Sequence, residues 1–190
     1  MNVARVLFPV KVLGPGNRVG IWLCGCHRGC KGCSNPELWE KKEEYEITIP
    51  QLLELIRRIN KEHVIDGFTI SGGEPMNQTN ELSILVDELK KISMDILIYS
   101  GYQIEELVNR DLQTQHVLDT IAVLIDGAYV EEKNDGSILR GSSNQRIHVL
   151  NDDLKPLYEE FLRKTINQIQ NFSTLDGIVS VGIHRKGFTP

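Results

Sequence analysis

Residues 19–33 read VGIWLCGCHRGCKGC, an apolar run followed at once by a cluster of cysteines. The aliphatic and aromatic residues of Val19–Leu23 predict a buried strand, because side chains of this kind favour extended backbone. All four cysteines of the chain lie in this stretch, at positions 24, 26, 30 and 33. A disulfide framework spreads its cysteines along the chain, so the cluster indicates free thiolates that bind a metal centre.

Outward from this stretch, short apolar runs alternate with segments of helical period, which is typical of βα units around a mostly parallel sheet. The expected strands cover residues 3–12, 19–23, 68–71, 95–99, 121–125, 146–150 and 178–183, and the expected helices cover 50–63, 82–89, 103–108 and 154–169. A complete TIM barrel takes about 250 residues. The expected fold is therefore α/β, an open, partial TIM-type (β/α) barrel of about five to six mostly parallel strands.

Composition predicts one globular domain over residues 1–190, with a core at 19–150 and a C-terminal helix and strand added at 151–190. Hydrophobic residues make up 41% of the chain, enough to bury a core. A net charge of −5 argues against binding to nucleic acid or to an anionic membrane. No run approaches the roughly 18 apolar residues of a membrane helix, and the start lacks the apolar segment of a signal peptide. We therefore expect a cytoplasmic protein.

The spacing of Cys26, Cys30 and Cys33 is C-x3-C-x2-C, placed directly after the predicted strand. In α/β folds this edge of the sheet commonly holds ligands. Structural zinc sites and ordinary [4Fe-4S] centres use four protein ligands, so three cysteines imply an iron left open for substrate. We expect Cys24 to be a packed thiol. A compact zinc site that includes it stays open as an alternative.

The cysteine loop resembles the signature of the radical S-adenosylmethionine (SAM) superfamily. A second segment, Gly72-Gly73-Glu74-Pro75, resembles the GGEP motif of the same superfamily. The resemblance implies that Cys26, Cys30 and Cys33 hold a [4Fe-4S] cluster and that SAM binds the open iron. It also implies that the GGEP segment receives the amino group of SAM, since glycines permit close approach and a carboxylate accepts bonds from an ammonium.

Further segments resemble the activating proteins of anaerobic ribonucleotide reductases, a branch of the glycyl-radical-enzyme activases. In chain order they are Gly32-Cys33-Ser34-Asn35 with Trp39, Tyr99-Ser100-Gly101-Tyr102, Leu124-Ile125-Asp126-Gly127 and Arg140-Gly141-Ser142-Ser143-Asn144-Gln145-Arg146. The resemblance implies SAM contacts from Ser100, Asp126 and Arg140, with Arg146 as a second candidate for the SAM carboxylate. Ala128-Tyr129 departs from the pattern of the family.

The resemblance implies reductive cleavage of SAM to methionine and a 5′-deoxyadenosyl radical, which removes hydrogen from a glycine of a partner enzyme such as anaerobic ribonucleotide reductase. It also implies anaerobic conditions and a flavodoxin- or ferredoxin-type electron donor. Two alternatives remain: a stand-alone radical SAM enzyme that modifies a peptide or metabolite, and a zinc or iron-sulfur module with a structural or electron-transfer role. The sequence leaves open the substrate, the oligomeric state and the roles of Cys24 and residues 151–190.

Overall fold

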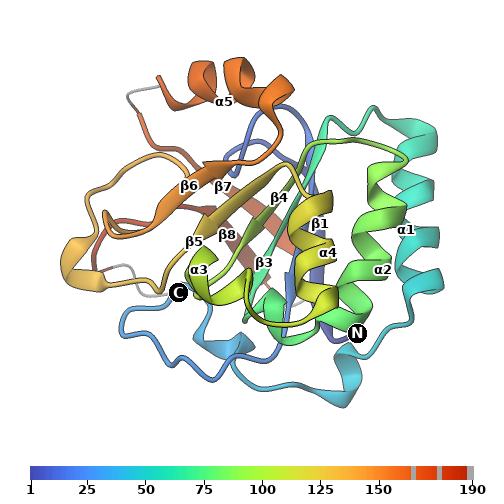
Figure 1. The fold of residues 1–190 in the computed structure, drawn as a ribbon, viewed down its shortest axis with the longest axis horizontal. Coiled ribbons are helices and arrows are strands. Elements are labelled where there is room, and N and C mark those ends of the chain that lie inside the picture. Colours follow the sequence, from blue (N-terminus) through green and yellow to red (C-terminus); the bar gives the residue numbers. More distant parts are fainter. Residues whose placement is uncertain (164–165, 175–176, 188–190) are drawn as a thin grey trace.

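A six-stranded sheet forms the centre of the computed structural model, which describes residues 1–163, 166–174 and 177–187 (Figure 1). Its strands, in their order across the sheet, are β1 (Val3–Val10), β2 (Arg18–Leu23), β3 (Gly67–Gly72), β4 (Ile96–Tyr99), β5 (Val123–Asp126) and β6 (Arg146–Val149). Strands β2 to β5 are parallel, whereas β1 and β6 run antiparallel to their neighbours. The α/β class and the open sheet are confirmed, but the TIM-type arrangement is not, because both edge strands are antiparallel and the described sheet does not close.

Three helices cover one face of the sheet (Figure 1). They are α1 (Ile49–Glu62), α2 (Thr79–Lys90) and α4 (Leu112–Thr120), while the short α3 (Ile104–Leu107) follows β4. Helix α1 begins one residue before the expected start at residue 50, with a proline in its first turn and with Thr48 and Gln51 in a capping box that was not predicted. Helix α4 was not predicted, because its residues, LQTQHVLDT, show little apolar periodicity.

Alternate residues of each strand face opposite sides of the sheet. On β2, Val19 and Ile21 pack against the helical layer, whereas Trp22 points to the other face. That second face is covered by α5 (Lys155–Leu162) and by a two-stranded antiparallel sheet of β7 (Ile169–Thr174) and β8 (Gly177–Gly182). The C-terminal elements therefore form a third layer on the side opposite α1, α2 and α4 (Figure 1).

The C-terminal segment differs from the helix expected at 154–169. Helix α5 ends at Leu162, and Ile169 opens β7, where it pairs with Gly182 of β8. The apolar spacing of these residues also fits a strand once β8 is present as a partner, so tertiary pairing decides the outcome. Residues 164 and 165, which fall inside the expected helix, lie outside the described part of the chain.

A buried ion pair joins the core to the C-terminal layer. The Arg18 guanidinium lies 2.5 Å from Oδ2 of Asp95, and Arg18 is fully buried. The Tyr158 hydroxyl on α5 donates to Oδ1 of Asp95 at 2.6 Å. Although burial opposes its charge, Tyr158 and Asp95 hold the pKa of Arg18 above its ordinary value. The start of β2, the residue before β4 and helix α5 are thus linked at the amino ends of the parallel strands.

Candidate functional site

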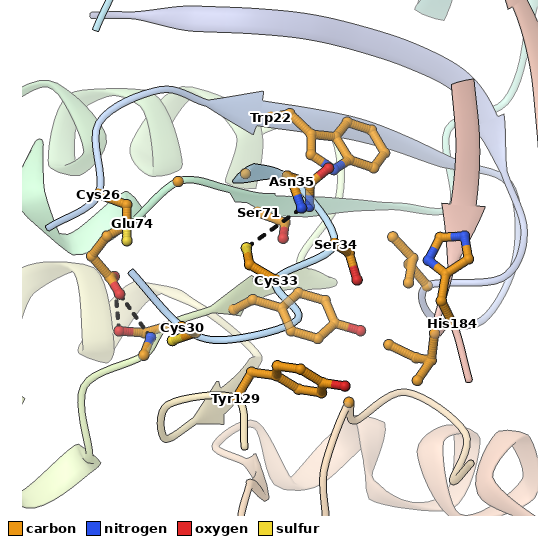
Figure 2. A pocket seen from close by; sticks show the side chains of 18 of the residues that line it. Trp22, Cys26, Cys30, Cys33, Ser34, Asn35, Ser71, Glu74, Tyr129 and His184 are labelled. Carbon is orange, nitrogen blue, oxygen red and sulfur yellow. Dashed lines mark hydrogen bonds between the residues drawn. The ribbon is translucent and has the colours of Figure 1, made fainter. Parts of the chain in front are cut away.

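One pocket lies at the carboxyl ends of the parallel strands and contains all three predicted cysteine ligands (Figure 2). Of the predicted site residues, its wall includes Cys26, Cys30, Cys33, Gly72, Gly73, Glu74 and Ser100. Strands β2, β3 and β4 each end at this wall, so parallel strand order brings together residues that are up to 74 positions apart in sequence, from Cys26 to Ser100. This is the edge at which open α/β sheets bind ligands.

The cysteine loop is anchored at its base and curled at two glycines. The backbone N–H of Cys26 donates to the carbonyl of Trp39 at 2.8 Å. Gly29 has φ 57° and Gly32 has φ 69°, a region that favours glycine. A bond from the Cys33 N–H to the Cys30 carbonyl, 3.1 Å long, closes the turn between these two residues. The loop therefore returns on itself, as its two glycines predict.

The thiols have a mixed environment of burial and backbone donors. Burial raises the pKa of Cys26, which a hydrogen bond from the Arg28 backbone opposes. Burial also raises the pKa of Cys30, with the neighbouring Cys33 acting in the same direction. The N–H of Asn35 donates to Sγ of Cys33 at 3.4 Å. Backbone donors of this kind stabilise thiolate sulfurs and tune the potential of iron–sulfur centres.

Cys24 has a different setting from the other three cysteines. It is fully buried and packs in an apolar cluster with Trp22 and Leu38. Burial raises the pKa of its thiol. It is absent from the wall of the cysteine pocket. Cys24 is therefore a packed thiol in this structure, which is the setting predicted for it.

The three pocket cysteines are compatible with a multi-iron centre. Within the described residues, no three side chains of cysteine, histidine, aspartate or glutamate are grouped closely enough to hold one metal ion. In a cubane cluster each thiolate binds a separate iron, so the sulfurs do not need to converge on one point. Cys24 is buried away from the wall that the other three cysteines share, which disfavours the compact zinc site that would include it.

The paired glycines of the GGEP segment are required by packing within the chain. Gly72 has φ 107°, and a Cβ there would lie 2.3 Å from the Leu23 carbonyl oxygen. A Cβ on Gly73 would lie 2.8 Å from the carbonyl oxygen of Gly25 and 2.9 Å from that of Leu38. The two glycines therefore let the end of β3 approach the base of the cysteine loop.

Glu74 is a buried carboxylate held by three donors. It accepts hydrogen bonds from the Gly101 N–H at 2.7 Å, the Ser100 hydroxyl at 2.9 Å and the Met76 N–H at 3.0 Å. Burial raises the pKa of Glu74, and these donors oppose that shift. The predicted pair of Glu74 and Ser100 is thus in direct contact, and its orientation at the pocket wall is fixed.

Arg28 is a pocket residue that sequence reasoning missed. Its Nε lies 3.8 Å from Oε2 of Glu74, and its guanidinium stacks 4.2 Å from the centre of the Tyr102 ring. Arg110 contacts the same ring at 4.8 Å. The arginine therefore ties the cysteine loop to Glu74 after β3 by charge and to Tyr102 after β4 by cation–π contact. Its position between two cysteines was the available signal.

Pro75, Asp126 and Arg140 are not part of the pocket wall. Pro75 is buried in the turn after Glu74. Arg140 pairs with Asp135 at 2.9 Å. Asp126 is fully buried and accepts from the Ile104 N–H at 2.8 Å.

Asp126 belongs to a charged cluster behind the pocket. The Arg146 side chain bonds both Asp126 and Glu105, and Nε2 of His148 lies 3.1 Å from Asp126. Although burial acts to raise it, the pKa of Asp126 lies below its ordinary value because Arg146 and the Ile104 N–H donate to the carboxylate. The structure thus gives Asp126 and Arg146 partners within the chain rather than a place at the pocket.

The pocket extends beyond the predicted residues to a wall that the sequence did not indicate. Tyr129 contributes from the loop after β5, and residues 179–184 contribute from β8 and the residues after it. Figure 2 shows His184 at the end of the pocket away from Cys26 and Glu74. The apolar run at 178–183 predicts a strand, but no catalytic motif in the sequence marks it as part of a site.

Comparison with known proteins finds a family model and several relatives that match most of the chain. Residues 12–148 match a family model described as a 4Fe-4S single cluster domain. An anaerobic ribonucleoside-triphosphate reductase-activating protein of Escherichia coli K12 is 33% identical over 150 residues, covering 75% of this chain and 96% of the relative. Proteins of the same name are 33% identical in Enterobacteria phage T4 (77% and 93% covered) and 34% identical in Haemophilus influenzae (74% and 94% covered). Separately, none of the described helices is long and apolar enough to cross a membrane.

Proposed function

The chain belongs to the 4Fe-4S single cluster domain family and to the anaerobic ribonucleoside-triphosphate reductase-activating proteins, and we propose that it is a radical SAM enzyme that generates a glycyl radical on such a reductase. The observation that carries this proposal is the single pocket shared by three loop cysteines and the buried Glu74. The names of the relatives support the partner, and the family model supports the iron–sulfur cluster.

Cys26, Cys30 and Cys33 are proposed to hold the cluster, and the left-handed turns at Gly29 and Gly32 support this by curling the loop around it. When bound, the cluster and SAM supply the electron transfer and the 5′-deoxyadenosyl radical that removes a hydrogen atom from the partner glycine. The chain positions these groups and shields them from water.

Glu74 is proposed to receive the amino group of SAM, with Gly72, Gly73 and Ser100 beside it. Its carboxylate is buried and oriented by three donors, so it can accept a further bond from an ammonium without reorganising. Pro75 fixes the turn that follows. SAM contacts by Asp126 and Arg140 stay predictions, because in this structure neither lines the pocket and each side chain has a partner within the chain.

We also propose a flavodoxin- or ferredoxin-type electron donor and a cytoplasmic location. The radical SAM assignment requires a reductant of low potential, and free thiolates persist in a reducing compartment. We further propose that residues 1–190 act as one radical SAM domain with its core at 19–150.

Anaerobic reconstitution tests the proposed function. The expected result is about four irons per chain and a reduced-cluster EPR spectrum that changes when SAM is added. Cys26→Ala, Cys30→Ala and Cys33→Ala should each abolish SAM cleavage, whereas Cys24→Ala, the matched control, should retain iron and activity. Zinc in place of iron, or a spectrum indifferent to SAM, contradicts the proposal. If SAM is cleaved but no radical forms on an added reductase, the stand-alone alternative is favoured.

A further inference from the structure

Strands β7 and β8 lie outside the matched family region. The family model ends at residue 148, before α5 and both strands. The relatives match along at least 93% of their own length but cover only 74–77% of this chain. The hairpin of β7 and β8, residues 169–174 and 177–182, is therefore an addition to the part of the chain that resembles those proteins.

The hairpin is firmly seated on the face of the sheet opposite the helices. Val181 is 2% exposed and Ile183 is 9% exposed, and both pack in the apolar cluster that contains Trp22. The Gln170 side chain accepts from the Lys11 N–H at 2.9 Å and donates to the Pro9 carbonyl at 2.7 Å. The hairpin is thus anchored to β1 and to β2.

A second anchor lies at the same end of the hairpin, in the residues that follow β8. Nδ2 of Asn134 donates to the His184 carbonyl at 2.9 Å, and Nδ2 of Asn167 donates to the Ile183 carbonyl at 2.6 Å. Asn134 follows the loop that carries Tyr129, another residue of the pocket wall. These contacts hold the carboxyl end of β8, and the residues after it, beside the pocket.

That surface carries a neutral polar pair. Six consecutive residues, 179–184, line the same pocket as the cysteines. Oγ of Ser180 lies 3.0 Å from Nε2 of His184. Burial lowers the pKa of His184, so its imidazole is neutral near pH 7. A hydroxyl and a neutral imidazole both donate and accept hydrogen bonds without charge, which suits the amides of a peptide backbone.

The position of this pair separates it from the proposed SAM contacts. Glu74 and Cys26 lie at one end of the pocket and His184 at the other, with Cys33 and Ser34 between them in Figure 2. A substrate segment that extends along the pocket from the cysteine end would contact the wall formed by residues 179–184. The proposed substrate is a glycine-bearing protein segment, whose recognisable groups are mainly backbone amides.

We propose that the added hairpin is a substrate-recognition element, in which Ser180 and His184 hydrogen-bond the backbone of the glycine-bearing segment of the reductase. The proposal rests on the function proposed above. It assigns a role in substrate binding to residues that lie outside the matched family region.

The test measures reductase activation by Ser180→Ala and His184→Leu, each reconstituted with iron and assayed with the anaerobic ribonucleoside-triphosphate reductase of the same organism. We expect each variant to raise the KM for the reductase about three- to tenfold, the loss expected for one hydrogen bond, and to leave the KM for SAM within about twofold. Ser173→Ala is the matched control: it removes a hydroxyl from an exposed residue of β7 and should change neither constant.

Three results would overturn the inference. In the first, Ser180→Ala retains its iron content and melting temperature and shows an unchanged KM for the reductase. In the second, both variants raise the KM for SAM as much as the KM for the reductase, which would place the hairpin at the nucleotide. The third concerns the wild-type protein: if it cleaves SAM and leaves the reductase without a radical, the proposed function itself fails, and this inference fails with it.

Discussion

Removing the charge of Asp95 should lower the unfolding free energy strongly, because Asp95 is the counter-charge of a buried arginine. The Arg18 side chain is fully buried and uses Asp95 as its only charged partner among the described ion pairs. Asp95→Asn keeps the shape of the side chain but leaves a buried guanidinium without a counter-charge. Breaking a buried pair in this way costs about 3–5 kcal/mol.

The surroundings of Arg18 set the size of this effect. Its guanidinium also donates to the Thr69 hydroxyl at 2.7 Å and to the carbonyls of Pro15 at 3.2 Å and Phe68 at 2.5 Å. These neutral acceptors satisfy its hydrogen bonds but do not neutralise its charge. For a chain of this length, a loss of about 3–5 kcal/mol lowers the melting temperature by about 6–20 °C.

Urea unfolding of the cluster-free protein, followed by circular dichroism, measures the free energy directly. Tyr158→Phe removes one bond to the same carboxylate and should cost about 1.5–3 kcal/mol, the value for a hydrogen bond to a charged group. Glu160→Gln, on the exposed side of α5, should be neutral. An Asp95→Asn variant within about 1 kcal/mol of wild type would refute the reasoning, since the Arg18 charge would then be compensated elsewhere.

Three other substitutions test the pocket and the cluster behind it. Gly73→Ala should lower the iron content after reconstitution, because its Cβ would meet two carbonyl oxygens at the base of the cysteine loop, and full iron loading would contradict this. Tyr102→Leu should speed the loss of iron to a chelator by removing the ring under Arg28, whereas Tyr102→Phe should not; equal loss in both would exclude stacking as the cause. Asp126 has a folded pKa below its unfolded value of about 3.9, so it contributes stability above that pH that is lost as pH falls through the folded pKa. In Asp126→Asn, the unfolding free energy of the cluster-free protein should therefore fall less steeply between about pH 5 and pH 3, and parallel curves would contradict the assignment.

Local sequence patterns predicted most of the secondary structure because each rests on short-range physics. Pro50 lies in the first turn of α1, close to the predicted start of that helix. The apolar runs at Val19–Leu23 and Phe68–Ser71 became adjacent parallel strands, joined in register. The cysteine loop and the GGEP segment were brought together because both follow such strands.

What the sequence did not reveal depends on long-range contacts. Ile169 fits the apolar face of a helix and also fits a strand, and only pairing with Gly182 selects the strand. Asp126 and Arg140 were assigned by resemblance, but the partners that hold them are 20 and 5 residues away in the chain and carry no motif. Arg28 was not predicted as a site residue, because its role depends on contacts with Glu74 and Tyr102, which are distant in sequence.

The C-terminal layer both buries one face of the open sheet and lines the cysteine pocket. Residues such as Trp22, Leu97 and Ile125 form an apolar face that would be exposed to water without a cover, and burying that face stabilises the fold. Apolar side chains are sufficient to cover this face, and Val181 on β8 and Ile183 just after it provide them. Ser180 on β8 and His184 just after it form a polar pair at the cysteine pocket instead, and polar groups there add no hydrophobic stabilisation to the core. This end of the hairpin therefore closes the core with one set of residues and offers hydrogen bonds to a substrate with the other.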